Sequence, residues 1–154
     1  MIDKRVPPLA AGLALCLWPT AAGAVDVNLS GIVANVCIVT STPGTLGLEP
    51  GGTVLSSAGG GGSPAGVQVT STGSNPRLTF SAPVATTPAG FSGTADTRIS
   101  YSVNGALLQA ETNVASVHLL SNLLNTISVS GRIASSDGFA SGTYNVKSVV
   151  TCQQ

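Results

Sequence analysis

Apolar and polar residues alternate with a period of two in several segments of the chain, and the pattern is clearest near the C-terminus. In residues 127–133 (ISVSGRI), one face carries Ile127, Val129, Gly131 and Ile133, and the other carries Ser128, Ser130 and Arg132. A second alternating segment starts at Thr143 and ends at Cys152, and its apolar face is weakened by Ser148. Residues 134–142 between them are rich in Ser, Gly and Asp, which favour a chain reversal. The pattern predicts two strands joined by a turn.

The same period is present at the start of residues 25–37, where one face carries Val25, Val27, Leu29, Gly31 and Val33. We predict an extended N-terminal strand there. Further short strands are predicted around residues 67–70, 78–80 and 99–103, and Asn104-Gly105 is a strong hairpin-turn signal.

Residues 106–125 are ambiguous, because one helical face would carry Val117, Leu120 and Leu124. Their Ser, Thr, Asn and Val content favours strands or loop, with a short helix as the alternative. Residues 40–66 are dominated by Gly, Ser, Pro and Thr, and the run 59–62 is a loop that lacks the Lys and the following helix of a phosphate-binding loop. About seven short strands punctuated by Gly and Pro predict an all-β fold, a sandwich.

The first 24 residues have the features of a secretory signal peptide: a charged start, an apolar run from Leu9 to Trp18, and the small-residue pattern Ala22-Gly23-Ala24. The apolar run is too short to span a bilayer. Cys16 raises lipidation as an alternative, but Leu15 is bulky where a small residue is needed. We therefore expect residues 1–24 to be removed and residues 25–154 to form a single domain in an extracytoplasmic compartment.

Charge is sparse, at 8% of all residues, with six basic and six acidic side chains. No cluster of Lys and Arg offers a surface for nucleic acid or for an anionic membrane. We expect neither of these partners, and no insertion into a membrane.

Two cysteines, Cys37 and Cys152, follow the predicted signal peptide. An even number in an oxidising compartment favours one disulfide, which would join the first strand to the last. The alternatives are a metal site or a reactive thiol, and His118 is the only histidine that could complete either. We predict a disulfide, no metal and no cofactor.

The residues needed for catalysis are few and scattered. His118 stands in the apolar run VASVHLL, where a partly buried structural histidine is expected. The acidic residues beyond the signal peptide are far apart in sequence: Asp26, Glu49, Asp96, Glu111 and Asp137. We predict no catalytic residue and no enzyme activity. Phe80, Tyr101 and Tyr144 fall on apolar strand faces and are predicted to lie in the core.

Several of these segments, in this order, resemble the spore coat protein U-like pilins of archaic chaperone-usher systems. The similar segments are VDVNLSGIVANVCIV (25–39), Gly44-Thr45-Leu46, Ile99-Ser-Tyr101-Ser-Val103, ISVSGRI, and Gly142-Thr-Tyr144 leading into VKSVVT. One departure concerns the second cysteine, which the family usually places after the strand corresponding to 67–70. This chain has Ser71 there, and Cys152 is the remaining candidate partner for Cys37.

The resemblance implies an immunoglobulin-like sandwich that lacks its last strand and is completed by a donor strand. It implies a structural subunit of a pilus or fimbria-like surface fibre, with a part in cell adhesion and biofilm formation. Its partners would be a periplasmic chaperone, an outer-membrane usher and neighbouring subunits, and its path would lead through the periplasm to the cell surface. Val25, Val27 and Leu29 are the candidate donor residues.

Two alternatives stay open at this point. Val25, Val27 and Leu29 could instead be the first strand of a self-complete sandwich. The protein would then be a secreted or periplasmic binding module that does not polymerise.

Overall fold

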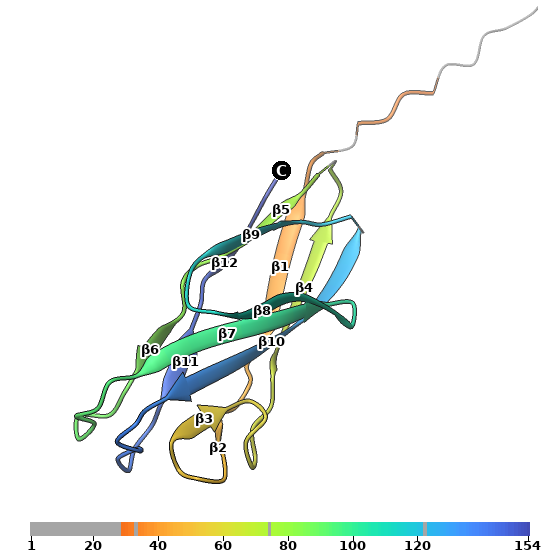
Figure 1. Cartoon of the computed structure of the whole chain (residues 1–154). Helices are drawn as coiled ribbons and strands as arrows, with labels where there is room; N and C mark the ends of the chain where they lie inside the picture. The colour runs from red at the N-terminus through yellow and green to blue at the C-terminus, as the bar shows by residue number, and fades with distance from the viewer. Residues whose placement is uncertain (1–28, 33, 74, 122) are drawn as a thin grey trace, which may run out of the picture. The chain divides into compact units, whose positions relative to one another are not determined.

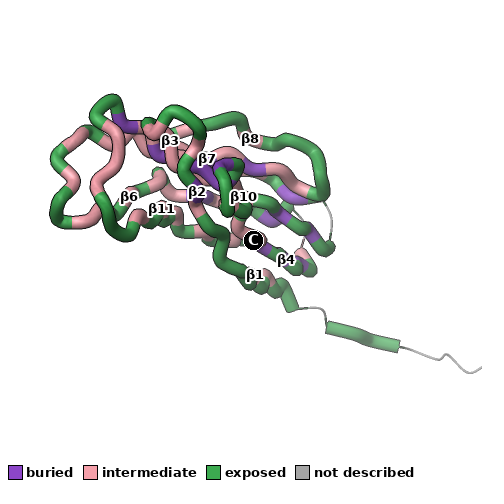
Figure 2. Tube along the Cα trace, turned by 90° about the horizontal axis from the view of Figure 1, so that it is seen from below, coloured by how far each residue is buried: buried purple, intermediate pink, exposed green. Residues whose placement is uncertain are grey.

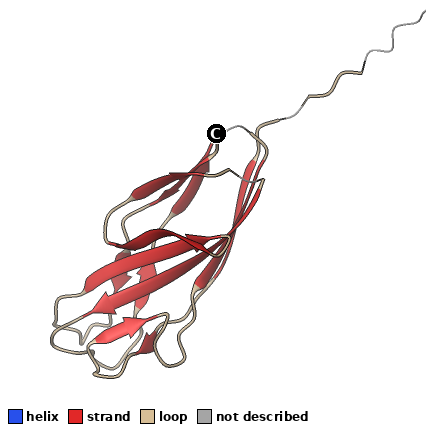
Figure 3. Ribbon diagram, turned by 45° about the vertical axis from the view of Figure 1, so that its right-hand side comes forward, coloured by secondary structure: helices blue, strands red, loops and turns tan. Residues whose placement is uncertain are grey.

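The computed structural model of the chain describes residues 29–32, 34–73, 75–121 and 123–154 (Figure 1). Residues 32–154 form one compact unit that contains every strand. The predicted signal peptide 1–24 lies outside the described residues. Figure 3 shows strands and loops and no helix among the described residues, and none of these residues form a helix that could cross a membrane.

The described residues form twelve strands, listed here in chain order. They are β1 (Cys37–Thr42), β2 (Gly47–Leu48), β3 (Val54–Ser56), β4 (Ala65–Ser71), β5 (Arg77–Phe80), β6 (Val84–Thr86), β7 (Asp96–Val103), β8 (Ala106–Thr112), β9 (Ser116–Leu119), β10 (Leu124–Ala134), β11 (Asn145–Lys147) and β12 (Val150–Gln153).

The larger sheet is organised around β10, the longest strand (Figure 1). One edge of β10 pairs with β4 and then with β3, and the other edge pairs with β7. β1 lies outside β4, β8 outside β7 and β2 outside β3, and all of these pairings are antiparallel. The predicted turn at Asn104-Gly105 joins β7 to β8, and both residues have positive φ, as a tight hairpin turn requires.

The second layer consists of two short sheets that follow one another along the same chain segments. β5 lies between β9 and β12, and β6 pairs with β11. Ser81 and Val149 connect the two sheets, because the Ser81 amide donates to the Val149 carbonyl at 2.9 Å and the Ser81 hydroxyl accepts from the Val149 amide at 2.8 Å. β11 and β12 are therefore one final strand interrupted at Ser148 and Val149.

The core lies between the two layers, as the buried segments in Figure 2 indicate. Phe80 and Tyr101 are buried as predicted, and their rings stack with centroids 4.1 Å apart. Leu78, Val69 and Ile127 are fully buried around them. The prediction of an all-β sandwich is confirmed.

The structure bears on the predictions for residues 106–125 and for residues 25–37. Residues 106–125 form strands β8 and β9 and no helix in the described part of that segment. The N-terminal strand expected over residues 25–37 begins only at Cys37, and this part of the prediction is wrong for the described residues before it. A period of two makes a segment suitable for a strand, but a strand also needs a neighbour to accept its hydrogen bonds.

Candidate functional site

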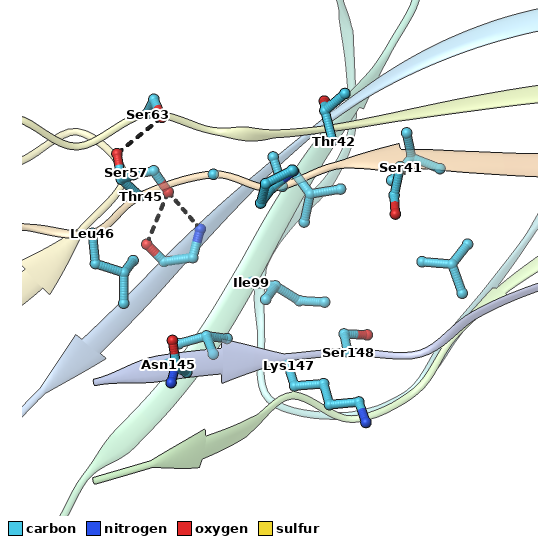
Figure 4. Close-up of a pocket in the computed structure, with 18 of the residues that line it drawn as sticks. Ser41, Thr42, Thr45, Leu46, Ser57, Ser63, Ile99, Asn145, Lys147 and Ser148 are labelled. Carbon is cyan, nitrogen blue, oxygen red and sulfur yellow. Dashed lines mark hydrogen bonds between the residues drawn. The ribbon is translucent and has the colours of Figure 1, made fainter. Parts of the chain in front are cut away.

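A groove of about 790 Å³ lies between β1 and the final strand β11/β12 (Figure 4). β1 pairs with β4 alone, and β11 and β12 pair with β6 and β5 alone, among the described residues. Each rim of the groove therefore has an edge whose backbone amides and carbonyls are not used in a ladder. Such an edge can accept one more strand.

The floor of the groove is apolar and comes from both layers. Figure 4 shows Ile99 of β7 between the rim residues Ser41 and Ser148. The floor is also lined by Val67, Phe80, Val129 and Gly131. An extended segment lying in the groove would place alternate side chains on this floor.

Burial changes sharply along β10 as it passes under the groove. Ile127 is fully buried, whereas Val129 and Gly131, on the same face, are only half-buried. Val146 and Val150 of the final strand are half-buried as well. The floor residues Ile99, Val67 and Phe80 are already buried. The apolar surface that a further strand would remove from water is therefore that of the half-buried Val129, Val146 and Val150.

Gly131 deepens the groove because it has no side chain. A Cβ atom at this position would lie 3.6 Å from both Leu46 Cδ2 and Val146 Cβ, an ordinary contact distance. Its backbone is held by Ser57, whose hydroxyl accepts from the Gly131 amide at 2.7 Å and whose amide donates to the Gly131 carbonyl at 3.0 Å. Ser57 thus fills the gap between β4 and β3 on this edge of β10.

Tyr144 was predicted to lie in the core, and the structure instead places it half-buried at one end of the groove. Its ring packs edge-on against Phe91 and Phe139, with centroid distances of 5.7 and 5.2 Å. Its hydroxyl donates to the Ala140 carbonyl at 3.1 Å. This aromatic cluster joins the 88–95 and 135–144 loops beside the groove.

The predicted disulfide between Cys37 and Cys152 is present, with Cα atoms 6.0 Å apart. It joins the start of β1 to β12, at the end of the groove opposite Tyr144. Ser71 lies directly across from Cys37 in the β1/β4 register and is buried. It stands at the position where the family that this chain resembles usually has its second cysteine. In this chain the bond therefore joins the two rims of the groove.

The candidate donor residues are only partly within the described part of the chain. Leu29 is 94% exposed, whereas Val25 and Val27 lie outside the described residues. The donor role of Val25, Val27 and Leu29 stays a prediction.

The acidic residues do not converge on one another. Asp96 pairs with Arg98 at 2.9 Å, Glu49 accepts a hydrogen bond from Ser56, and Glu111 lies 3.8 Å from Arg132. Asp137 lies in the loop after β10, and Asp26 is outside the described residues. Among the residues that the structure describes, no three His, Cys, Asp or Glu side chains are grouped so that they could hold a metal ion.

His118 belongs to β9 in the second layer, and its ring lies edge-on to the Tyr101 ring with centroids 5.3 Å apart. Its Nε2 atom is buried and has no hydrogen-bond partner among the described residues. Burial lowers the pKa of His118, because the charged imidazolium would lose its hydration. The pKa of Tyr101 is raised by burial, an effect partly offset by its hydrogen bond to Ser116.

We expect the lowered pKa of His118 to make folding pH-dependent. The unfolded chain protonates His118 as the pH falls below about 6.5, while the folded chain still resists protonation, so the free energy of unfolding should decrease there and level off below the folded pKa. Urea unfolding between about pH 7.5 and pH 5, above most carboxyl titration, measures this. His118→Leu should remove that part of the slope, and an unchanged slope would show that other groups cause it.

Comparison with protein-family models, with curated proteins and with solved structures gave no match for this chain.

Proposed function

We propose that the chain is a structural subunit of a surface fibre, in which the groove of one subunit receives the N-terminal segment of the next. The proposal rests on the groove between two strands with unused edges, in which Val129, Val146 and Val150 are only half-buried. A strand added there gains main-chain hydrogen bonds from both rims and buries alternate side chains on the floor.

The resemblance to spore coat protein U-like pilins supplies the rest of the proposal. A periplasmic chaperone would fill the groove first, and the donor segment of another subunit would replace it at an outer-membrane usher. Because the donor and the groove are different surfaces of the same chain, the contact is head-to-tail and propagates into a fibre. Low surface charge is compatible with a subunit that is covered by its neighbours.

The donor role of Val25, Val27 and Leu29 is tested by charge substitution. Val27→Asp together with Leu29→Asp should abolish fibres, because two carboxylates would have to enter an apolar groove. Fibres are scored by electron microscopy of cells that also express a chaperone and an usher.

The matched control places the same two charges on the opposite face, as Asn28→Asp with Ser30→Asp, and should still assemble. Both variants must remain folded in the periplasm. If the Val27/Leu29 variant forms fibres as the control does, the donor assignment is wrong.

A further inference from the structure

We propose that the Cys37–Cys152 disulfide is a stop that fixes the register of the strand bound in the groove. This inference rests on the proposed function, because it concerns how far the N-terminal segment of a second copy can enter. Three observations support this proposal: the spacing of the two rims, the length of the groove and the path of the chain before β1.

The disulfide closes one end of the groove to any strand. Neighbouring strands in a sheet lie about 4.8 Å apart, so a strand inserted between β1 and β12 requires the two rims to be about 9.6 Å apart. The Cα atoms of Cys37 and Cys152 are only 6.0 Å apart. Beyond the disulfide, the Gln154 side chain donates to the Val36 carbonyl at 2.6 Å and connects the rims again.

The other end of the groove is open to solvent. There the rims are formed by Pro43, Gly44 and Thr45 on one side and by Asn145 on the other, and all four residues are exposed. β1 begins at the disulfide and β12 runs toward it, so the rims are antiparallel (Figure 1). A strand that enters from the open end therefore advances until it reaches the disulfide.

The length between the stop and the open end sets the number of residues that fit. Taken two residues at a time from the disulfide, the lining residues of the two rims give four levels, which we infer to be Val39 with Val150, Ser41 with Ser148, Pro43 with Val146, and Thr45 with Tyr144. Each rim therefore contributes residues over the length of about seven residues of extended chain. Residues 25–31 have this length, with Val25, Val27, Leu29 and Gly31 on one face.

The donor pattern alone does not define the register. A shift by two residues exchanges valine with valine or leucine, and leucine with glycine, on the same face, so the apolar face stays toward the floor. Ser41 and Ser148 at the second level offer small polar side chains rather than a shaped pocket. Because the disulfide blocks the bound strand at a fixed position, it selects one register among those that the side chains would accept equally.

The occupant is the segment of a second copy rather than of the same molecule. The chain reaches β1 at the closed end, where Thr72 accepts from the Val36 amide at 2.9 Å and donates to the Ala34 carbonyl at 2.8 Å. A segment of the same molecule would have to turn back over the disulfide to enter the groove. A segment of another molecule can enter from the open end directly.

The test maps the register by photo-crosslinking on the full chain. The probes are synthetic peptides of residues 25–35 with a diazirine analogue of leucine at position 25, 27 or 29, and crosslinked residues are identified by mass spectrometry. In the wild-type protein each position should crosslink to one level of the groove. In Cys37→Ser/Cys152→Ser each position should crosslink to at least two levels, and position 25 should reach residues 37 and 152.

A single level in both proteins would overturn the stop while leaving the proposed function intact. Absence of any crosslink in the wild-type groove would overturn the proposed function and the stop together. Only double-variant protein with the circular dichroism spectrum of the wild type enters the comparison.

A second measurement needs no variant. The peptide of residues 25–31 is extended by Val-Asn at either end, and amide hydrogen exchange of the bound peptides is measured on wild-type protein. In the peptide lengthened at the end that meets the disulfide, the added residues should take the first level and shift residues 25–31 by two toward the open end, so that amides 30 and 31 exchange as fast as in free peptide. Protection of residues 25–31 and of the added pair together in that peptide would overturn the stop.

Discussion

Gly131→Leu is expected to abolish binding of a donor strand while the sandwich stays folded. The leucine side chain would occupy the groove between Leu46 and Val146, where the glycine now leaves space. A peptide of residues 25–35 would lose the burial of about two apolar side chains, which corresponds to at least about 100-fold weaker binding. The bonds of Ser57 to the Gly131 backbone do not involve a side chain at position 131 and should persist.

Binding of the labelled peptide to the chain from residue 25 onward is measured by fluorescence anisotropy. Ser128→Leu is the matched control, because it adds the same side chain to the outer, exposed face of the same strand. Gly131→Ala should bind almost normally, since its Cβ atom makes only ordinary contacts. Wild-type affinity in Gly131→Leu would show that the peptide binds elsewhere.

Loss of the disulfide is expected to have the largest effect on stability. Cys37 and Cys152 are 115 residues apart in sequence, so the bond closes nearly the whole compact unit into one loop. Cys37→Ser with Cys152→Ser should lower the free energy of unfolding by about 4 to 5 kcal/mol on the chain-entropy account. For a domain of this size that corresponds to a fall in Tm of roughly 15 °C or more.

Urea unfolding of the wild type and the double variant measures this difference. Ser71→Ala, beside Cys37 in the register, serves as a control for disturbance of the same site without loss of the bond. A decrease below about 1 kcal/mol for the double variant would mean that the covalent link contributes little beyond the packing around it.

The strands with one clear buried face could be predicted from the sequence. β10 and β7 alternate because one face covers the core and the other meets solvent. β8 was ambiguous for a physical reason, because it is an edge strand on which the adjacent Leu107 and Leu108 are both exposed. A strand without a buried face shows no alternation of apolar and polar residues in its sequence.

The groove could not be predicted from the sequence, although two of its residues gave a signal. Gly131 and Ser148 interrupt otherwise apolar faces, and both line the groove. Which edges remain unpaired depends on how distant segments such as β1 and β12 come together, and no local pattern contains this. For the same reason Tyr144 was predicted to lie in the core when it lies at the groove.

The disulfide followed from cysteine number and compartment alone, but its place at the end of the groove did not. The segment before β1 shows the opposite case, because its alternation predicts a strand, whereas the described residues 29–32 and 34–36 form none and β1 begins at Cys37. On the proposed function, the missing partner of that segment is the groove of another molecule.

We propose that subunits are joined by strand exchange, and an SDS gel of protein sheared from the cell surface, loaded unheated beside heated and probed for this chain, tests this. We expect a ladder in the unheated lane that collapses to one band on heating, since a bound strand is held by many hydrogen bonds but by no covalent bond. A single monomer band in both lanes, with the protein in the periplasm or the medium, would contradict it.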